Sequence, residues 1–120
     1  MINHVTIKVK DFEKEAAFYE AALAPLGYGK GPGFPGVQAF VGGDGSAVWV
    51  NTAADGEAVA PIHVAFQAAD EDAVKAFRKA GLEHDGTDNG QPGPRPKYGP
   101  TYYAAFVHDP EGNNIEAMLA

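Results

Sequence analysis

The chain has 120 residues, which is the usual size of one domain and enough to bury a hydrophobic core without disulfides. Its 16 acidic side chains outnumber the 9 lysines and arginines, so the formal charge of −7 offers no positive field for phosphate backbones or anionic lipids. We therefore expect no nucleic-acid or membrane partner. The chain has no cysteine, which excludes disulfides, thiolate metal sites and a cysteine nucleophile. The N-terminus lacks the apolar segment of a signal peptide and no run approaches the ~18 apolar residues of a spanning helix, so we expect a cytoplasmic protein.

The two halves of the sequence resemble each other at an offset of 59 residues, which aligns His4 with His63. A second resemblance follows in the same order, because residues 39–41 and 105–107 both read Ala-Phe-Val. Chance similarity between two alanine-rich amphipathic segments is the alternative, but the shared order favours a duplicated unit. The other matching pairs are Val5 and Val64, Asp11 and Asp70, Ala17 and Ala76, Phe18 and Phe77, Ala21 and Ala80, and Leu23 and Leu82.

The first half is predicted to form a strand, a helix and a strand hairpin. Apolar and polar residues alternate over 4–9, which is the period of a half-buried strand. Asp11 stands where an N-cap belongs, ahead of a helix predicted over 12–24 that Pro25 ends. An extra strand is possible in the glycine-rich stretch after Gly27. Further strands are predicted at 37–41 and 47–51.

The second half repeats this order, with Asp70 as the N-cap of a helix over 71–80 and Gly81 at its C′ position. The stretch 83–100 does not fit the repeat, because it has four prolines, four glycines and no apolar period. It is predicted to be a long loop, either a lid over a substrate or a passive mobile connection. The strands of this half are predicted at 62–67, 102–107 and 114–119. The fold class is therefore α+β, a single domain over 1–120 with modules at about 1–55 and 60–120.

Strand periodicity places three possible metal ligands on the face that points away from the helices. His4, His63 and Glu116 alternate along their strands with apolar residues that must pack on a helix. Two imidazoles and one carboxylate form the facial triad that holds Fe, Mn, Zn or similar divalent ions and leaves positions open for substrate. Each residue alone is ordinarily structural or solvated, but the two histidines occupy the same place in both repeats. His84 and His108 fall in a predicted loop and turn, so they are expected to be solvated and are not assigned as ligands.

The opening residues 3–9, Asn-His-Val-Thr-Ile-Lys-Val, and the closing residues 106–116, Phe-Val-His-Asp-Pro-Glu-Gly-Asn-Asn-Ile-Glu, resemble the vicinal oxygen chelate superfamily. This superfamily includes glyoxalase I, bleomycin-resistance proteins, extradiol ring-cleaving dioxygenases and fosfomycin-resistance thiol transferases. The resemblance spans nearly the whole chain. It implies two βαβββ modules whose mixed sheets curl into a cup around a divalent metal ion such as Fe, Mn, Zn or Ni, with the cup often completed across a dimer.

One departure from the family pattern bears on the chemistry. Resemblance to glyoxalase I would require a fourth, carboxylate ligand in the first module, but an offset of 67 places Trp49 opposite Glu116. Tryptophan cannot ligate a metal, so the ligand set resembles that of the extradiol dioxygenases and the fosfomycin-resistance enzymes. Trp49 is expected either to form the floor of the cup or simply to be buried in the core or a dimer interface. The resemblance also implies that Thr6 touches substrate.

Two classes of function remain open. The first is a divalent-metal enzyme that acts on a small oxygenated molecule, with no general base identified. Arg95 and Lys97 would meet an anionic substrate, although solvated loop cations are the alternative. Only one of Tyr102 and Tyr103 can face the cup, and Tyr103 is the predicted substrate contact. The second class is a metal-free protein that sequesters a drug or metabolite, as the bleomycin-resistance members do. In both cases a homodimer is predicted, because the inner sheet faces would otherwise expose apolar side chains.

Overall fold

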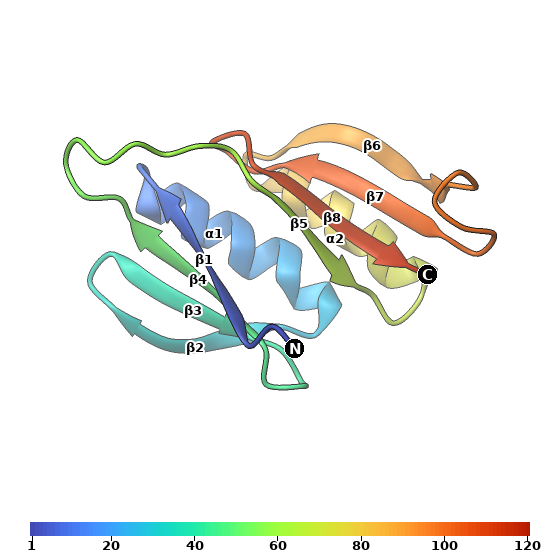
Figure 1. Cartoon of the computed structure of the whole chain (residues 1–120), viewed down its shortest axis with the longest axis horizontal. Helices are drawn as coiled ribbons and strands as arrows, with labels where there is room; N and C mark the ends of the chain where they lie inside the picture. Colours follow the sequence, from blue (N-terminus) through green and yellow to red (C-terminus); the bar gives the residue numbers. More distant parts are fainter.

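The computed structural model describes residues 1–120 and has two similar modules arranged side by side along the longest axis (Figure 1). The first module consists of β1 (His4–Val9), α1 (Phe12–Leu23), the 3₁₀ turn η1 (Ala24–Leu26), β2 (Gly29–Phe34), β3 (Val37–Val41) and β4 (Ala47–Thr52). The second consists of β5 (His63–Gln67), α2 (Glu71–Glu83), β6 (Thr87–Pro94), β7 (Tyr103–His108) and β8 (Asn114–Leu119). Each module is therefore a βαβββ unit, which confirms the duplicated α+β fold.

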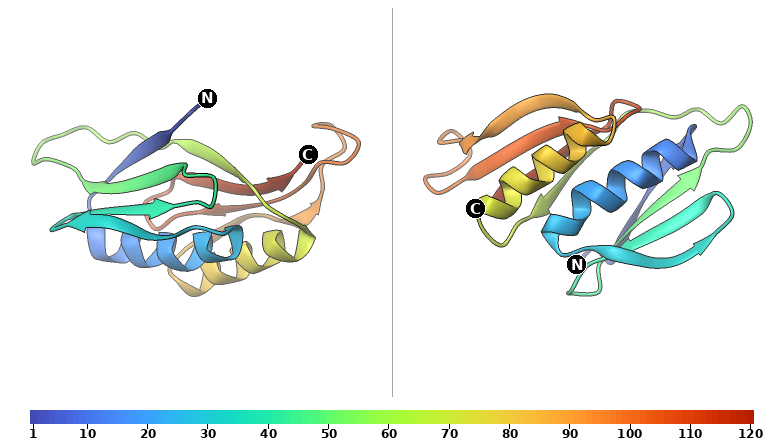
Figure 2. Two further views of the ribbon diagram at one scale, coloured as in Figure 1. Left: turned by 90° about the horizontal axis from the view of Figure 1, so that it is seen from below. Right: turned by 180° about the vertical axis from the view of Figure 1, so that it is seen from behind.

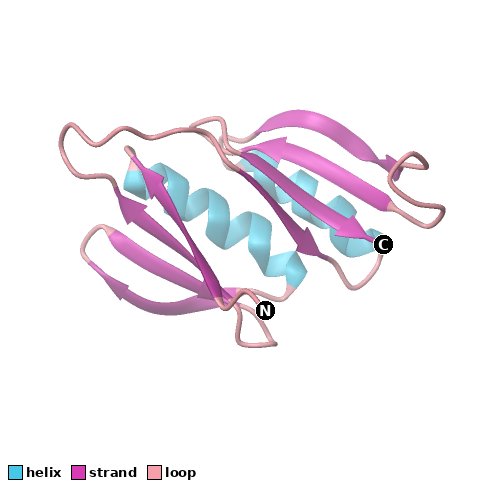
Figure 3. Ribbon diagram, in the orientation of Figure 1, coloured by secondary structure: helices cyan, strands magenta, loops and turns pink.

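Each module has its own four-stranded mixed sheet. The strand orders are β1-β4-β3-β2 and β5-β8-β7-β6, in which the first two strands are parallel and the remaining pairs are antiparallel. Both helices lie on the same side of the sheets (Figure 2), and the colouring by secondary structure in Figure 3 shows the strands as a layer over them. The opposite face of each sheet is left without a covering element in the single chain.

The hydrophobic core runs through both modules as one cluster. The helix-facing residues of β1, Ile7 and Val9, are buried, as is Phe66 of β5. Phe18 of α1 and Phe77 of α2 are fully buried in the same cluster. The strand periodicity therefore identified the helix-facing side correctly, and the intervening residues lie on the open face.

The two N-caps are confirmed, but the end of α2 differs from the prediction. The Asp11 carboxylate accepts the backbone N–H of Lys14, and that of Asp70 accepts the N–H of Ala73. The second helix continues to Glu83, so Gly81 lies inside it rather than at C′. A Cβ on Gly81 would meet the side chains of Phe18 and Val107 at 3.2–3.3 Å, so this glycine allows α2 to approach them closely.

The prediction of a long loop over 83–100 is wrong for its central part. Residues 87–94 form β6, which pairs antiparallel with β7 and takes the place in its sheet that β2 takes in the other. An edge strand tolerates proline because one side of its backbone needs no partner, and irregular pairing on both sides of Gly90 accommodates the extra residues. The extra strand expected after Gly27 is present as β2.

The turn between β7 and β8 connects the second module to the start of α1. The Glu111 carboxylate accepts the backbone N–H groups of Lys10 and Asp11, while the Glu111 N–H donates to Glu15 Oε1 at 2.9 Å. The Tyr19 hydroxyl of α1 donates to Asp109 Oδ2 at 2.6 Å. These contacts join residues about 90 to 100 positions apart, so they fix one module against the other.

Neither helix is long and apolar enough to cross a membrane.

Candidate functional site

The open face of the second module brings a histidine and a buried carboxylate together. Glu116 lies at the centre of β8 opposite Ala65 of the parallel strand β5, and His63 lies two residues before Ala65 on the same face. His63 Nε2 is 2.9 Å from Glu116 Oε1. The Glu116 residue is only 3% exposed, whereas the His63 side chain is 53% exposed. The Glu116 carboxylate is thus buried, and the exposed imidazole of His63 lies beside it.

Tyr102 completes this group from the turn before β7. Its hydroxyl donates to Glu116 Oε2 at 2.6 Å, so each carboxylate oxygen has a different neighbour. The hydrogen bond to Glu116, together with burial, raises the pKa of Tyr102 to about 12, so its hydroxyl stays protonated at neutral pH.

Tyr103, the tyrosine expected to face the cup, instead packs against the hydrophobic core. The structure places Tyr102 rather than Tyr103 beside the candidate ligands. The sequence did contain a signal for this: counting back by twos from Val107 assigns Tyr103 to the helix-facing side, and Val107 is fully buried.

His4, the third candidate ligand, lies on the open face of the first module. Its Nδ1 is 2.8 Å from the side-chain oxygen of Asn3, and the residue is exposed. No group of three or more His, Asp or Glu side chains in the single chain is placed to hold a metal ion. In the single chain His4 is therefore not grouped with His63 and Glu116.

The strand registers show that Trp49 occupies in the first module the position of Glu116 in the second. Thr6 of β1 pairs with Trp49 of β4, as Ala65 of β5 pairs with Glu116 of β8. The offset of 67 residues between the two modules is therefore correct at these strands. Trp49 is partly exposed and Thr6 is exposed, so both are placed on the open face where a second chain or a ligand can reach them.

Arg95 and Lys97 lie in the turn between β6 and β7, on the same side as Glu116. The Arg95 guanidinium lies 5.4 Å from the centre of the Phe106 ring, and Phe106 pairs with Glu116 across β7 and β8. The Lys97 ammonium is 5.4 Å from the Tyr98 ring. A cavity of about 360 Å³ lies beside them, lined by Asn89, Gly90, Arg95, Lys97, Tyr98, Phe106 and Asn114.

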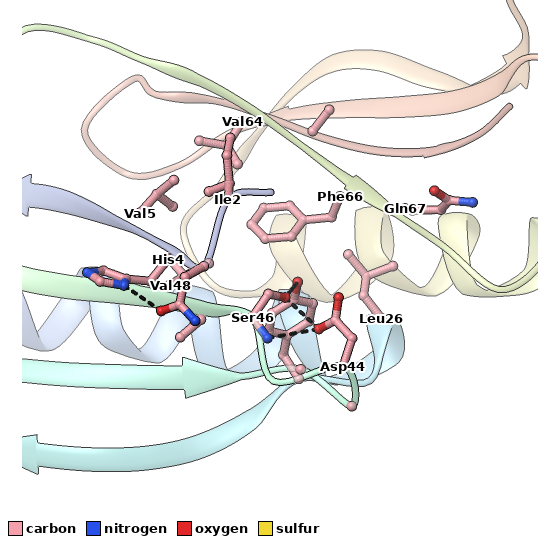
Figure 4. A pocket seen from close by; sticks show the side chains of 16 residues that line it. Ile2, His4, Val5, Leu26, Asp44, Ser46, Val48, Val64, Phe66 and Gln67 are labelled. Atoms are coloured by element: carbon pink, nitrogen blue, oxygen red, sulfur yellow. Dashed lines mark hydrogen bonds between the residues drawn. The ribbon is translucent and has the colours of Figure 1, made fainter.

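A larger cavity of about 470 Å³ lies between the modules, where the edge strands β1 and β5 approach each other (Figure 4). Its walls are mostly apolar, including Leu26, Val48 and Phe66, and His4 lies on its rim. Neither His63 nor Glu116 lines this cavity. The β5 residues that line this cavity include no His, Asp or Glu side chain that could bind a metal or carry a proton. We therefore place the candidate site at the His63–Glu116 pair.

Comparison with known proteins agrees with this architecture. A family model described as "Glyoxalase/Bleomycin resistance protein/Dioxygenase superfamily" matches residues 1–117. The crystal structure of a glyoxalase/bleomycin resistance protein from Albidiferax ferrireducens T118 is 30% identical, with a TM-score of 0.85 and 98% of both chains covered. A glyoxalase/bleomycin resistance protein/dioxygenase family enzyme from Burkholderia phytofirmans PsJN is 19% identical, with a TM-score of 0.75 and coverage of 97% of this chain and 95% of that one. A lactoylglutathione lyase from Agrobacterium tumefaciens is 18% identical, with a TM-score of 0.72 and coverage of 98% and 92%. No curated protein matches the chain.

Proposed function

Because the chain belongs to the glyoxalase/bleomycin resistance protein/dioxygenase superfamily, we propose that it is a divalent-metal enzyme acting on a small oxygenated molecule. The metal, such as Fe, Mn, Zn or Ni, is held by His63 and Glu116 of one chain and by His4 of a second chain in a homodimer. The observation that carries the proposal is the buried Glu116 carboxylate with the His63 imidazole 2.9 Å away on an otherwise open sheet face. With Trp49 at the fourth position, the ligand set is of the ring-cleaving dioxygenase or epoxide and thiol transferase type rather than that of glyoxalase I.

The donor chemistry of this face fits a divalent cation. Neutral imidazole and carboxylate are suitable ligands for these ions, and both point toward the same side of the sheet. Tyr102 holds Glu116 Oε2 by a hydrogen bond, which is the kind of outer contact that orients a metal-bound carboxylate. When bound, the metal would supply Lewis acidity toward substrate oxygens.

The protein's own groups would prepare this site for reaction. Burial of Glu116 keeps water from competing for its carboxylate, and the Tyr102 hydroxyl stays protonated and restricts its rotation. Thr6 and Trp49, on the open face of the first module, would contact the substrate from the second chain.

The arrangement of the modules supports a site shared between two chains. Their helices lie on one side, so the open faces of a single chain do not enclose a common space (Figure 2). A two-fold axis that sets the first module of one chain over the second module of the other would build two equivalent cups. Each cup would combine His4 of one chain with His63 and Glu116 of its partner.

Subunit exchange tests the shared site. Neither His4→Ala nor Glu116→Gln homodimers should hold metal with wild-type occupancy, because every site lacks one ligand. After mixing and exchange, the heterodimer regains one intact site from the native His4 of one subunit and the native Glu116 of the other. Metal content measured by elemental analysis should then recover. Absence of recovery despite exchange proven by mass spectrometry would refute sharing, and full metal retention in two of the three variants His4→Ala, His63→Ala and Glu116→Gln would refute the ligand set.

A metal-free protein that sequesters a drug or metabolite is the second candidate function. It is favoured by the fact that His63 and Tyr102 already satisfy both oxygens of Glu116. A buried carboxylate with two such neighbours is stable without a cation. Elemental analysis of protein purified without chelator distinguishes the two: a metal-free protein whose ligand binding is unchanged in His63→Ala supports sequestration.

A further inference from the structure

We propose that the cavity beside Arg95 binds the carboxylate of a small aromatic substrate whose ring lies along Phe106 toward His63 and Glu116. The inference rests on the proposed function, since it names a substrate class for the same face of the molecule. It is carried by the position of Arg95, by the lack of a carboxylate within ion-pair distance of its guanidinium, and by the aromatic rings between Arg95 and the candidate ligands.

The Arg95 guanidinium is held in place by hydrogen bonds and still has unpaired N–H donors. Its Nη1 donates to the carbonyl oxygens of Gly93 at 2.9 Å and Pro94 at 3.3 Å, and its Nη2 donates to that of Gln91 at 2.7 Å. Stacking on Phe106 at 5.4 Å holds the plane of the guanidinium. Three hydrogen bonds to backbone oxygens leave two of the five N–H donors of a guanidinium without a protein acceptor. The side chain is therefore preorganised rather than free to find a partner.

The cavity is positive in a protein that is otherwise acidic. Acidic residues outnumber lysines and arginines by 16 to 9, yet no carboxylate lies within 4.0 Å of the charged atoms of Arg95 or Lys97. None of the seven lining residues is acidic. The Asn89 amide donates to Asn114 Oδ1, so the Asn114 amide N–H groups remain available to the cavity. Charge and donors together favour an oxyanion, and the guanidinium geometry favours a carboxylate.

The aromatic rings define the rest of the ligand. Phe106 lies between the two chemical groups, with its ring centre 5.4 Å from Arg95 and 6.3 Å from the His63 ring. Tyr98 packs against Tyr102 at 5.5 Å on the same side. One ring therefore separates the cation from the candidate ligands. A flat ligand lying along this ring would place a carboxylate at Arg95 and a second oxygen near His63 and Glu116.

Calorimetric titration of the 120-residue chain with 4-hydroxybenzoate and with its neutral analogue 4-hydroxybenzamide tests the inference. We expect the carboxylate to bind at least about tenfold more tightly than the amide, because a charge-assisted hydrogen bond contributes more than a neutral one. Arg95→Gln should weaken 4-hydroxybenzoate about tenfold and Lys97→Gln about threefold, with little effect on the amide. Lys75→Gln, which removes an exposed positive charge on α2, is the matched control and should leave both affinities unchanged.

The outcomes separate this inference from the metal proposal. Lys97 makes no hydrogen bond or ion pair, so the Lys97→Gln variant remains informative if Arg95→Gln fails to fold. Titrations are made on metal-depleted protein, on metal-loaded protein and on His63→Ala. A carboxylate preference in all three supports the subsite even where elemental analysis finds no metal site. Equal binding of the two probes overturns the subsite even if metal binding is confirmed. Wild-type affinity for 4-hydroxybenzoate in folded Arg95→Gln and Lys97→Gln overturns it as well. Either result shows that Arg95 only stabilises the irregular strand β6.

Discussion

Replacing Glu15 by glutamine should stabilise the protein at neutral pH. Glu15 lies in the first turns of α1 and is fully buried, and its Oε2 atom has no hydrogen-bond partner. Burial, followed by the neighbouring carboxylates of Asp109 and Glu111, raises the pKa of Glu15 from 4.5 to about 9. The folded protein therefore holds a proton at this carboxyl group over a pH range in which the unfolded chain has released it.

The sign and size of the effect follow from proton linkage. Below pH 4.5 the Glu15 carboxyl group is protonated in both states, and its contribution to stability is fully present. Between pH 4.5 and about 9 only the folded state keeps the proton, so the free energy of unfolding falls as pH rises. Each pH unit corresponds to about 1.4 kcal/mol, which gives a loss of about 3 kcal/mol at pH 7. Glutamine keeps an oxygen to accept the Glu111 N–H and does not titrate.

Urea unfolding at pH 5, 7 and 8, followed by the fluorescence of the single tryptophan Trp49, measures this difference. The free energy of unfolding of Glu15→Gln minus that of wild type should be about 1 kcal/mol at pH 5 and about 3 kcal/mol at pH 7, and should rise further at pH 8. Glu13→Gln, an exposed substitution in the same helix turn, should show no such slope. A difference that does not change with pH, or a Glu15→Gln variant that is less stable at every pH, would refute the assignment of a proton to Glu15.

Three further predictions follow from the packing and the registers. Gly86→Ala should destabilise the fold by about 3 kcal/mol in urea unfolding, because a Cβ there would lie within 2.6–2.8 Å of backbone and core atoms, whereas Gly43→Ala, which meets nothing within 4 Å, should change little. Asp70→Ala should cost about 1 kcal/mol in the same assay through loss of the N-cap of α2, and an unchanged stability would show that the hydrogen bond to Ala73 contributes nothing. Trp49→Glu should raise metal affinity by adding a fourth ligand to the shared site, and an unchanged affinity would mean that the two open faces do not enclose one ion.

The duplicated architecture and the faces of its strands are predictable from the amino-acid sequence alone. The alignment of His4 with His63 carries the repeat, and alternation along residues 4–9 and 62–67 is a local property that fixes which side chains point to the helices. The helix starts at Asp11 and Asp70 are also predictable from the sequence, because an N-cap hydrogen bond joins residues only three positions apart. For the same reason the alternation predicts that His63 and Glu116 share one face, where their side chains lie 2.9 Å apart.

Features that depend on contacts between distant segments could not be predicted from the sequence. The residues of β6 have little strand propensity, so the sequence predicts a loop there. They form an edge strand because they pair with β7. The placement of Arg95 over the Phe106 ring likewise depends on the turn that precedes β7. Burial of Glu15, and after it the carboxylates of Asp109 and Glu111 that the β7–β8 turn places beside α1, raise the pKa of Glu15. Such contacts are set by packing of the two modules, because burial and charge act through space and not along the chain.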